Sequence, residues 1–186
     1  MTRASSISFP AVGPLGRLSA LLCVACALTG AAAELVLAWV WLSPSLVESL
    51  VAPRLGLAGA SLALDGATRL IGFAVSMLPM LVLFYVLHQA SALFDGYRLG
   101  RVFTAAAPLR LRRIGLGLVA LAGLRPVTAT LLGLVLTYAN APGQRMLVIG
   151  FSLDDVLLAL VGGLIVAIGH VMVEANALAE DQRAII

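Results

Sequence analysis

Two charged side chains lie inside stretches of sequence that are otherwise apolar. Arg125 stands beside Pro126 in the run from Ile114 to Ala139, and Glu34 is the only acid of an earlier run. Proline has no N–H, so the carbonyl of Ala122, four residues back, loses its helical donor. An arginine in an apolar environment needs acceptors. We therefore expect Arg125 to be satisfied by this carbonyl or by Glu34.

The preferred interpretation is an intramembrane polar pair between Arg125 and Glu34. At about 1.5 Å of helical rise per residue, Arg125 lies about 17 Å from Ile114, and Glu34 lies about 24 Å from Leu18. A long arginine side chain can close much of this difference in depth. The pair would tie two helices together at a proline kink. A role as the polar centre of a solute or proton path stays open as the alternative.

Cysteines and histidines offer weaker candidates. Cys23 and Cys26 form C-x-x-C on one face of an apolar helix, away from the helix N-terminus that a redox pair uses. We expect them to be small buried hydrophobic residues. His88 and His170 could ligate a haem between helices, but interface histidines are the expectation. Because no P-loop, nucleophile elbow or metal triad is present, we expect no enzyme activity, cofactor or metal.

Composition identifies the elements that must position these residues. Of the 186 residues, 61% are hydrophobic and 11% are charged, against roughly 25% charged in a soluble domain. A spanning helix needs about 20 apolar residues. The sequence therefore predicts an all-α protein, a four-helix transmembrane bundle that forms a single integral membrane domain over residues 1–186, with spans at about 18–42, 70–88, 114–139 and 156–173. Residues 43–69, broken by prolines and glycines, are expected to form a loop with a short interfacial helix.

Arginine placement predicts the orientation. Eight arginines fall on one side of the spans: Arg3, Arg17, Arg98, Arg101, Arg110, Arg112, Arg113 and Arg183. Three fall on the other side: Arg54, Arg69 and Arg145. Because cytoplasmic loops carry the excess of positive charge, we expect a multi-pass protein of the inner (cell) membrane with both termini and the central loop in the cytoplasm. The aromatic residues Trp39, Trp41 and Tyr138 would then lie at the outer interface.

The central loop holds the densest group of arginines: Arg98, Arg101, Arg110, Arg112 and Arg113. Thr104 fits the N-cap of a short amphipathic helix in this loop, and Pro108 is tolerable in its first turns. These arginines would contact the bilayer through its anionic headgroups, at about 1 kcal/mol each. A docking surface for a cytoplasmic protein partner is the alternative. The net charge of +3 is too small to suggest nucleic acid.

The same segment carries a family-like motif, formed by Gly100, Phe103, Thr104, Leu111, Arg112, Ile114 and Gly115. It resembles the central signature of a bacterial family known as domain of unknown function 2975. Ala107 stands where that family often has an asparagine, and the ending VMVEANALAEDQRAII is similar to the family's acidic C-terminus. The resemblance implies a four-helix membrane protein with no known activity. It also hints at pairing with a small Cro-like helix-turn-helix regulator, because members are often encoded beside one.

These observations favour a non-enzymatic interaction or regulatory membrane protein that presents its basic loop and acidic tail to the cytoplasm. A small-solute or ion permease component, centred on Arg125 and Glu34, is the first alternative. A b-type cytochrome with His88 and His170 as ligands is the weaker one. The sequence leaves open whether the protein forms a homo-oligomer.

Overall fold

The computed structural model describes residues 14–99, 106–138, 140, 150 and 152–184. Its long elements are the helices α1 (Pro14–Leu42), α4 (Gly66–Arg98), α5 (Ala106–Thr137) and α6 (Leu153–Ala184), and the described residues contain no strand. Each of these four helices holds a stretch long and apolar enough to cross a membrane: Gly16–Leu42, Gly66–Tyr97, Ala106–Thr137 and Leu153–Ala175. The prediction of an all-α protein with four membrane-spanning helices is confirmed.

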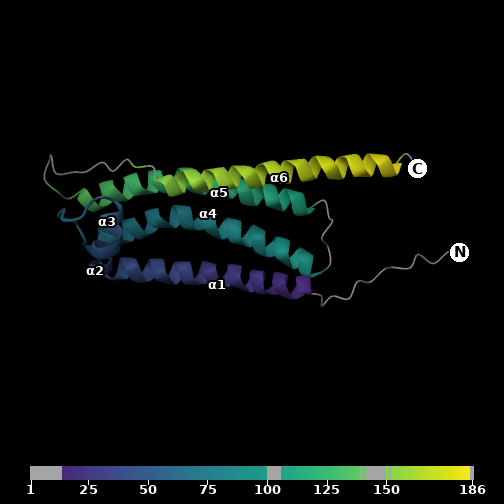
Figure 1. Cartoon of the computed structure of the whole chain (residues 1–186). Helices are drawn as coiled ribbons and strands as arrows, with labels where there is room; N and C mark the ends of the chain where they lie inside the picture. The colour runs from purple at the N-terminus through teal and green to yellow at the C-terminus, as the bar shows by residue number, and fades with distance from the viewer. Residues whose placement is uncertain (1–13, 100–105, 139, 141–149, 151, 185–186) are drawn as a thin grey trace.

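The four helices pack in chain order, so that α1 contacts α4, α4 contacts α5, and α5 contacts α6. Figure 1 shows them as a row, with α1 and α6 at its two edges. Helix α1 begins, and α6 ends, at the end of the row where α5 begins, which we call the basic end. The opposite end is the cap end. The assignment of the basic end to the cytoplasm stays a prediction.

Residues 43–65, the cap segment, fold over the cap end (Figure 1). The segment contains α2 (Pro44–Leu46), the π-helical turn η1 (Val47–Val51) and α3 (Ala52–Arg54), which together form the short helical piece predicted for this loop. The backbone N–H of Ala63 donates to the carbonyl of Leu136 at 3.0 Å, and this bond joins the cap segment to the end of α5. The cap segment is therefore an integral part of the packing.

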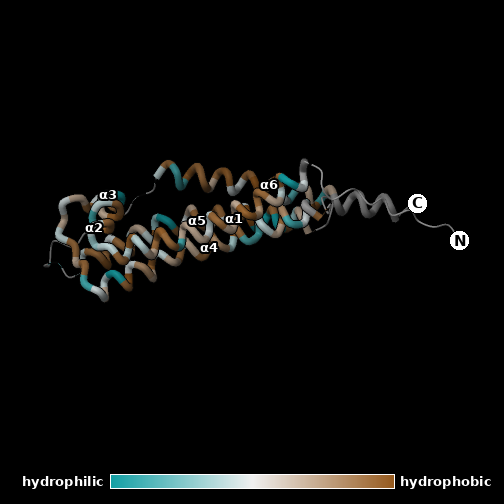
Figure 2. Tube along the Cα trace, turned by 90° about the horizontal axis from the view of Figure 1, so that it is seen from below, coloured by the Kyte–Doolittle hydropathy of each residue, from teal (hydrophilic) through white to brown (hydrophobic). Residues whose placement is uncertain are grey.

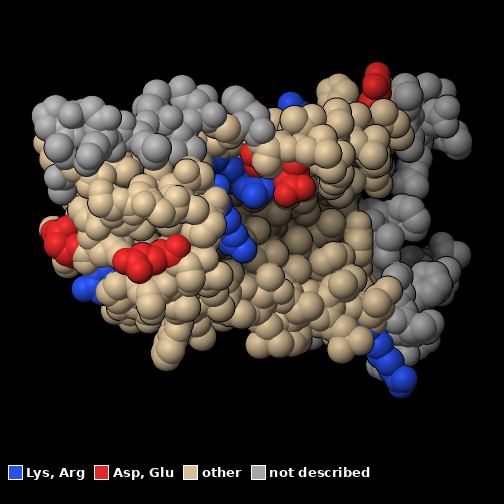
Figure 3. Space-filling model, turned by 60° about the vertical axis from the view of Figure 1, so that its left-hand side comes forward, with Lys and Arg blue, Asp and Glu red and all other residues tan. Residues whose placement is uncertain are grey.

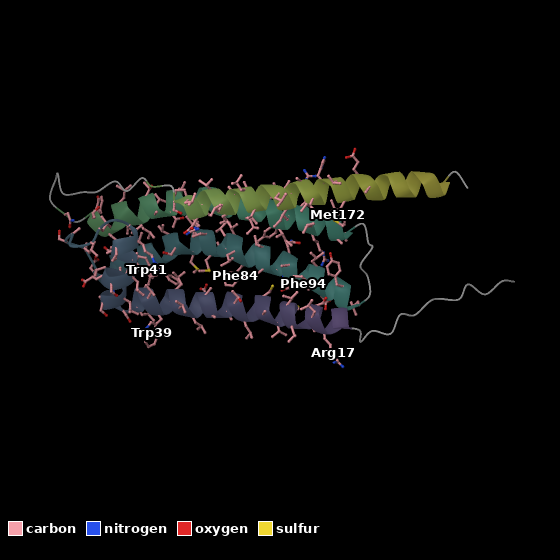
Figure 4. All side chains as sticks on the ribbon, viewed as in Figure 1. Arg17, Trp39, Trp41, Phe84, Phe94 and Met172 are labelled. Atoms are coloured by element: carbon pink, nitrogen blue, oxygen red, sulfur yellow. The ribbon has the colours of Figure 1, made fainter. Side chains whose placement is uncertain are left out.

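A hydrophobic core cluster of buried residues lies at the cap end: Trp41, Val47, Ala52, Leu55, Leu57, Leu132 and Leu136. Trp41, predicted to lie at the outer membrane interface, is buried in this cluster, and its depth in a membrane stays a prediction. It is 4% exposed, and its indole N–H donates to Ser76 Oγ on α4 at 3.1 Å. The six-membered ring covers Gly72 so closely that a Cβ there would lie 2.1 Å from it. Trp39 points away from the bundle instead (Figure 4).

Glycines allow α5 and α6 to approach closely. A Cβ on Gly115 would lie 2.6 Å from the carbonyl oxygen of Gly162, and one on Gly169 would lie 2.9 Å from the backbone nitrogen of Arg112. Small residues at such contacts drive helix association in lipid, where burial of apolar surface gives no advantage. Figure 2 shows apolar residues along all four long helices, as a lipid environment requires. These contacts also fix the register of α6 along α5.

Candidate functional site: an Arg–Asp pair in an open groove

Helix α6 begins well short of the cap end of α5. Asp155, in the first turn of α6, contacts Arg125, and Arg125 lies twelve residues before Thr137, the last residue of α5. At about 1.5 Å per residue, α6 therefore begins about 15 Å short of the end of its neighbour. Figures 1 and 2 both show α6 stopping short of the cap segment. The start of α6 thus lies alongside apolar residues of α5.

A capping box defines this helix start. The backbone N–H of Ser152 donates to Asp155 Oδ2 at 3.1 Å, and the backbone N–H of Asp155 donates to Ser152 Oγ at 3.3 Å. Two N–H groups that lack helical partners are satisfied in this way. The carboxylate also lies where the helix dipole favours negative charge. The capping-box hydrogen bonds therefore hold the Asp155 carboxylate in place independently of Arg125.

Arg125 and Asp155 form an ion pair between α5 and α6. Arg125 Nη1 lies 3.1 Å from Asp155 Oδ1, and the two side chains are 46% and 8% exposed. Oδ1 is buried and accepts no hydrogen bond, so the ion pair with Arg125 is its one partner among the described residues. Asp155 is buried by the helices, whereas much of the guanidinium stays open. Arg125 therefore keeps donors that Asp155 does not use.

An open groove of about 650 Å³ lies beside this pair. Its polar lining includes Arg54 of α3, Arg125 and Asp155, and its apolar walls come from α1, the cap segment, α4 and α5. Figure 3 shows one face of the molecule hollowed, with basic and acidic side chains gathered at the edge of the hollow. A volume of this size falls within the range of ligand-binding sites, about 300–1,000 Å³.

The predicted partner of Arg125 was wrong. Arg125 pairs with Asp155 on α6, and within the described residues its side chain forms no ion pair with Glu34 and no hydrogen bond to the Ala122 carbonyl. Glu34 lies on α1, which packs against α4 rather than α5, and its Oε2 is buried without a hydrogen-bond partner. The helices that carry the two predicted partners, α1 and α5, both pack against α4. An interhelical tie at Arg125 exists, but it joins α5 to α6.

Asp155 was missed because the fourth span was predicted to begin at Val156, which put the acid in a loop. One sequence signal was available. Ser152, two intervening residues and Asp155 have the spacing of a capping box ahead of an apolar run. That signal predicts a helix start at Leu153 and a fixed carboxylate in its first turn. Asp155, on the next helix, would then have been a candidate partner of opposite charge for Arg125.

The predicted basic loop is described only in part. Arg110, Arg112 and Arg113 lie in the first turns of α5, which run on without a break into the third span. The predicted short amphipathic helix is thus the start of α5 and not a separate element. Arg112 and Arg113 are exposed, while Arg110 is half-buried and lines a cavity of about 290 Å³ with Asp95 and Tyr97. Arg98 ends α4.

Of the family-like motif, Leu111, Ile114 and Gly115 lie on α5, with Gly115 at its contact with α6. Arg101 and the motif residues Gly100, Phe103 and Thr104 lie outside the described residues.

The remaining candidates are not brought together. His88 lies on α4 and His170 on α6, both are exposed, and α5 packs between these helices. This placement does not form the inter-helix pocket that a bis-histidine haem needs. Cys23 and Cys26 are half-buried on α1 and are free thiols.

The fold and the sites define a multi-pass membrane protein with four spanning helices. More specifically, the chain belongs to the family described as "Protein of unknown function (DUF2975)", whose family model matches residues 50–186. The resemblance found in the sequence is confirmed. No curated protein and no solved structure matches the chain.

Proposed function

We propose that this protein is a non-enzymatic interaction or regulatory protein of the bacterial cell membrane, which binds a cytoplasmic protein at its basic end. The observation that carries the proposal is the length of α6. Gly169 packs against Pro108 and Arg112 near the start of α5, but α6 continues to Ala184. Those further fifteen residues extend about 22 Å past the contact.

The projecting end of α6 has no described helix beside it (Figure 1). A single helix of this length is marginal in water without a packing partner. Its sequence includes the charged residues Glu174, Glu180, Asp181 and Arg183. The exposed Arg112 and Arg113 lie in the first turns of α5, near the place where α6 extends past it. Together they offer a partner a helix to pack against and charges of both signs that set its orientation.

Site-specific photo-crosslinking in cells tests the proposal. A crosslinker at position 177, on the projecting part of α6, should give one protein adduct of constant mass. The double variant Arg112→Gln with Arg113→Gln should reduce that adduct several-fold. Arg17→Gln is the matched control, because Arg17 is also exposed at the basic end, on α1 (Figure 4), and it should leave the adduct unchanged. A correctly inserted protein that gives only lipid adducts would refute the proposal.

Topology must be established in the same cells. Reporter fusions after residues 5, 105 and 184 are expected to be cytoplasmic, and fusions after 55 and 145 extracytoplasmic. The reason is the excess of arginine at the basic end. A cytoplasmic signal after residue 55 would contradict both the orientation and the proposed partner side.

A small-solute or ion permease component is the second candidate, and one observation favours it. Helix α6 begins beside an ion pair at a depth where α5 is still apolar. In many transporters, helix ends within the membrane form the substrate or ion site. Proteoliposomes that contain a pH-sensitive dye provide the test. A proton or ion leak that Arg125→Leu abolishes in a stably folded protein would support this candidate over the first.

A further inference from the structure

The groove beside Arg125 carries an excess of positive charge. Its charged lining residues are Arg54, Arg125 and Asp155, which sum to one positive charge. Arg54 is exposed and forms no ion pair with any other described residue. Asp155 already accepts from Ser152 through one oxygen and faces Arg125 Nη1 with the other. A guanidinium has five N–H donors, so Arg125 can bind a further anion.

Most of the rest of the lining is apolar, and its other polar side chains are the hydroxyls of Ser76, Thr128 and Ser152. Leu37, Val40 and Trp41 of α1 face the groove, with Ala129 and Leu132 of α5. Such walls suit a hydrocarbon chain and would not retain a small hydrated ion. The two parts of the lining therefore select a molecule with an anionic group at one end and an apolar body.

The groove opens sideways. It is lined by both edge helices of the row, α1 and α6, and by the helices between them. Figure 3 shows a hollow on one face of the molecule, and such a face of spanning helices would meet lipid in a membrane. Because α6 begins about 15 Å short of the cap end of α5, it leaves this face open. A ligand would enter it from the bilayer.

We propose that this groove binds an anionic lipid, whose phosphate or carboxylate sits between Arg54 and Arg125 and whose acyl chain lies along α1 and α5. Asp155 holds Arg125 in place for the anion, and the cap segment brings Arg54 to the same site. The proposal concerns the opposite end of the molecule from the proposed partner surface and does not depend on it.

Native mass spectrometry of the full-length protein tests the proposal. The protein is transferred into detergent with equal amounts of palmitoyl-oleoyl phosphatidylglycerol and palmitoyl-oleoyl phosphatidylcholine. We expect phosphatidylglycerol adducts to exceed phosphatidylcholine adducts about tenfold. Both lipids carry an anionic phosphate that the guanidinium groups can bind, but the choline cation of phosphatidylcholine cancels this charge, so only phosphatidylglycerol brings net negative charge to the positively charged groove. Equal binding of the two lipids would overturn the proposal.

Variants locate the binding. Arg54→Gln should reduce the preference for phosphatidylglycerol several-fold without affecting folding, since Arg54 is exposed and forms no ion pair within the part of the chain that the structure describes. Arg125→Gln should reduce it further. Arg17→Gln, at the basic end, is the matched control and should have no effect. A preference that survives both groove variants would show that the lipid binds elsewhere.

A steric variant distinguishes a lipid from a free anion. Ala33→Trp narrows the apolar wall, because Ala33 lines the groove, and it leaves both arginines in place. It should reduce phosphatidylglycerol binding as strongly as Arg54→Gln. Excess inorganic phosphate should not displace the lipid. Displacement of the lipid by phosphate would refute a lipid site in the groove. Lipid adducts that are carried by a dimer and that do not change in the arginine variants would also refute it.

Discussion

The ion pair between Arg125 and Asp155 can be tested by a double-mutant cycle in detergent. Arg125→Leu removes the cation, and Asp155→Asn removes the anion while keeping an oxygen that accepts from the Ser152 N–H. Asp155 is 8% exposed, so the single variant Arg125→Leu leaves a buried carboxylate without its counter-charge. We expect the double variant to be more stable than the sum of the two single losses implies.

The magnitude follows from the geometry. Two unit charges 3.1 Å apart attract by about 5 kcal/mol at an effective dielectric constant of about 20. Removing Asp155 from water offsets much of this attraction, and the 46% exposure of Arg125 weakens it further. A coupling energy of about 1–2 kcal/mol remains. For a chain of this size, that energy corresponds to about 2–8 °C in the melting temperature.

Thermal unfolding followed by fluorescence-detected size exclusion supplies the four melting temperatures. A second cycle serves as the control. Arg125→Leu combined with Glu34→Gln should be additive within about 0.5 kcal/mol, because these two residues do not contact each other. Additivity in the Asp155 cycle would refute the pair. Coupling in the Glu34 cycle would mean that Glu34 and Arg125 interact, which the structure does not show.

Three further predictions use the same melting assay. Gly162→Ala should destabilise the protein by about 1–3 kcal/mol, since its Cβ would lie 2.9 Å from backbone atoms of α5, whereas Gly163→Ala, whose Cβ meets nothing within 4 Å, should be neutral or stabilising. Trp41→Phe should cost about 1–3 kcal/mol, because it removes a buried hydrogen bond and leaves a cavity. The Thr68 hydroxyl lowers the pKa of Asp65 below its ordinary value of 3.8, so the deficit of Asp65→Asn should be largest at neutral pH and vanish as the pH falls through that lowered pKa.

The sequence was a good guide to the spans because span length and apolar composition are imposed by the bilayer itself. The helices exceed the apolar runs at several ends, and α4 reaches from Gly66 to Arg98 against a predicted 70–88. A helix that has formed can continue through polar residues at its ends. Hydropathy therefore marks the membrane-crossing part of a helix and not its boundaries.

Side-chain partners were harder to predict, because depth alone does not reveal which helices are neighbours. Glu34 and Arg125 both lie far inside their helices, but α4 packs between α1 and α5. Trp41 illustrates the same point for burial. Its position near a helix end suggested an interface residue, yet Gly72 and Ser76 on α4 provide space and a hydrogen-bond acceptor that draw the ring inward.

The position at which α6 begins links the capping box, the ion pair of Arg125 and the open groove. The capping box of Ser152 and Asp155 fixes a helix start opposite the middle of α5, and that start supplies the acid which Arg125 needs in an apolar run. Because α6 extends no further toward the cap end, the outer side of Arg125 faces an open groove and not another helix. Pro126, buried beside the pair, lines the same groove. Arg125 is therefore stabilised on one side by Asp155, and its other side is left free to bind a ligand.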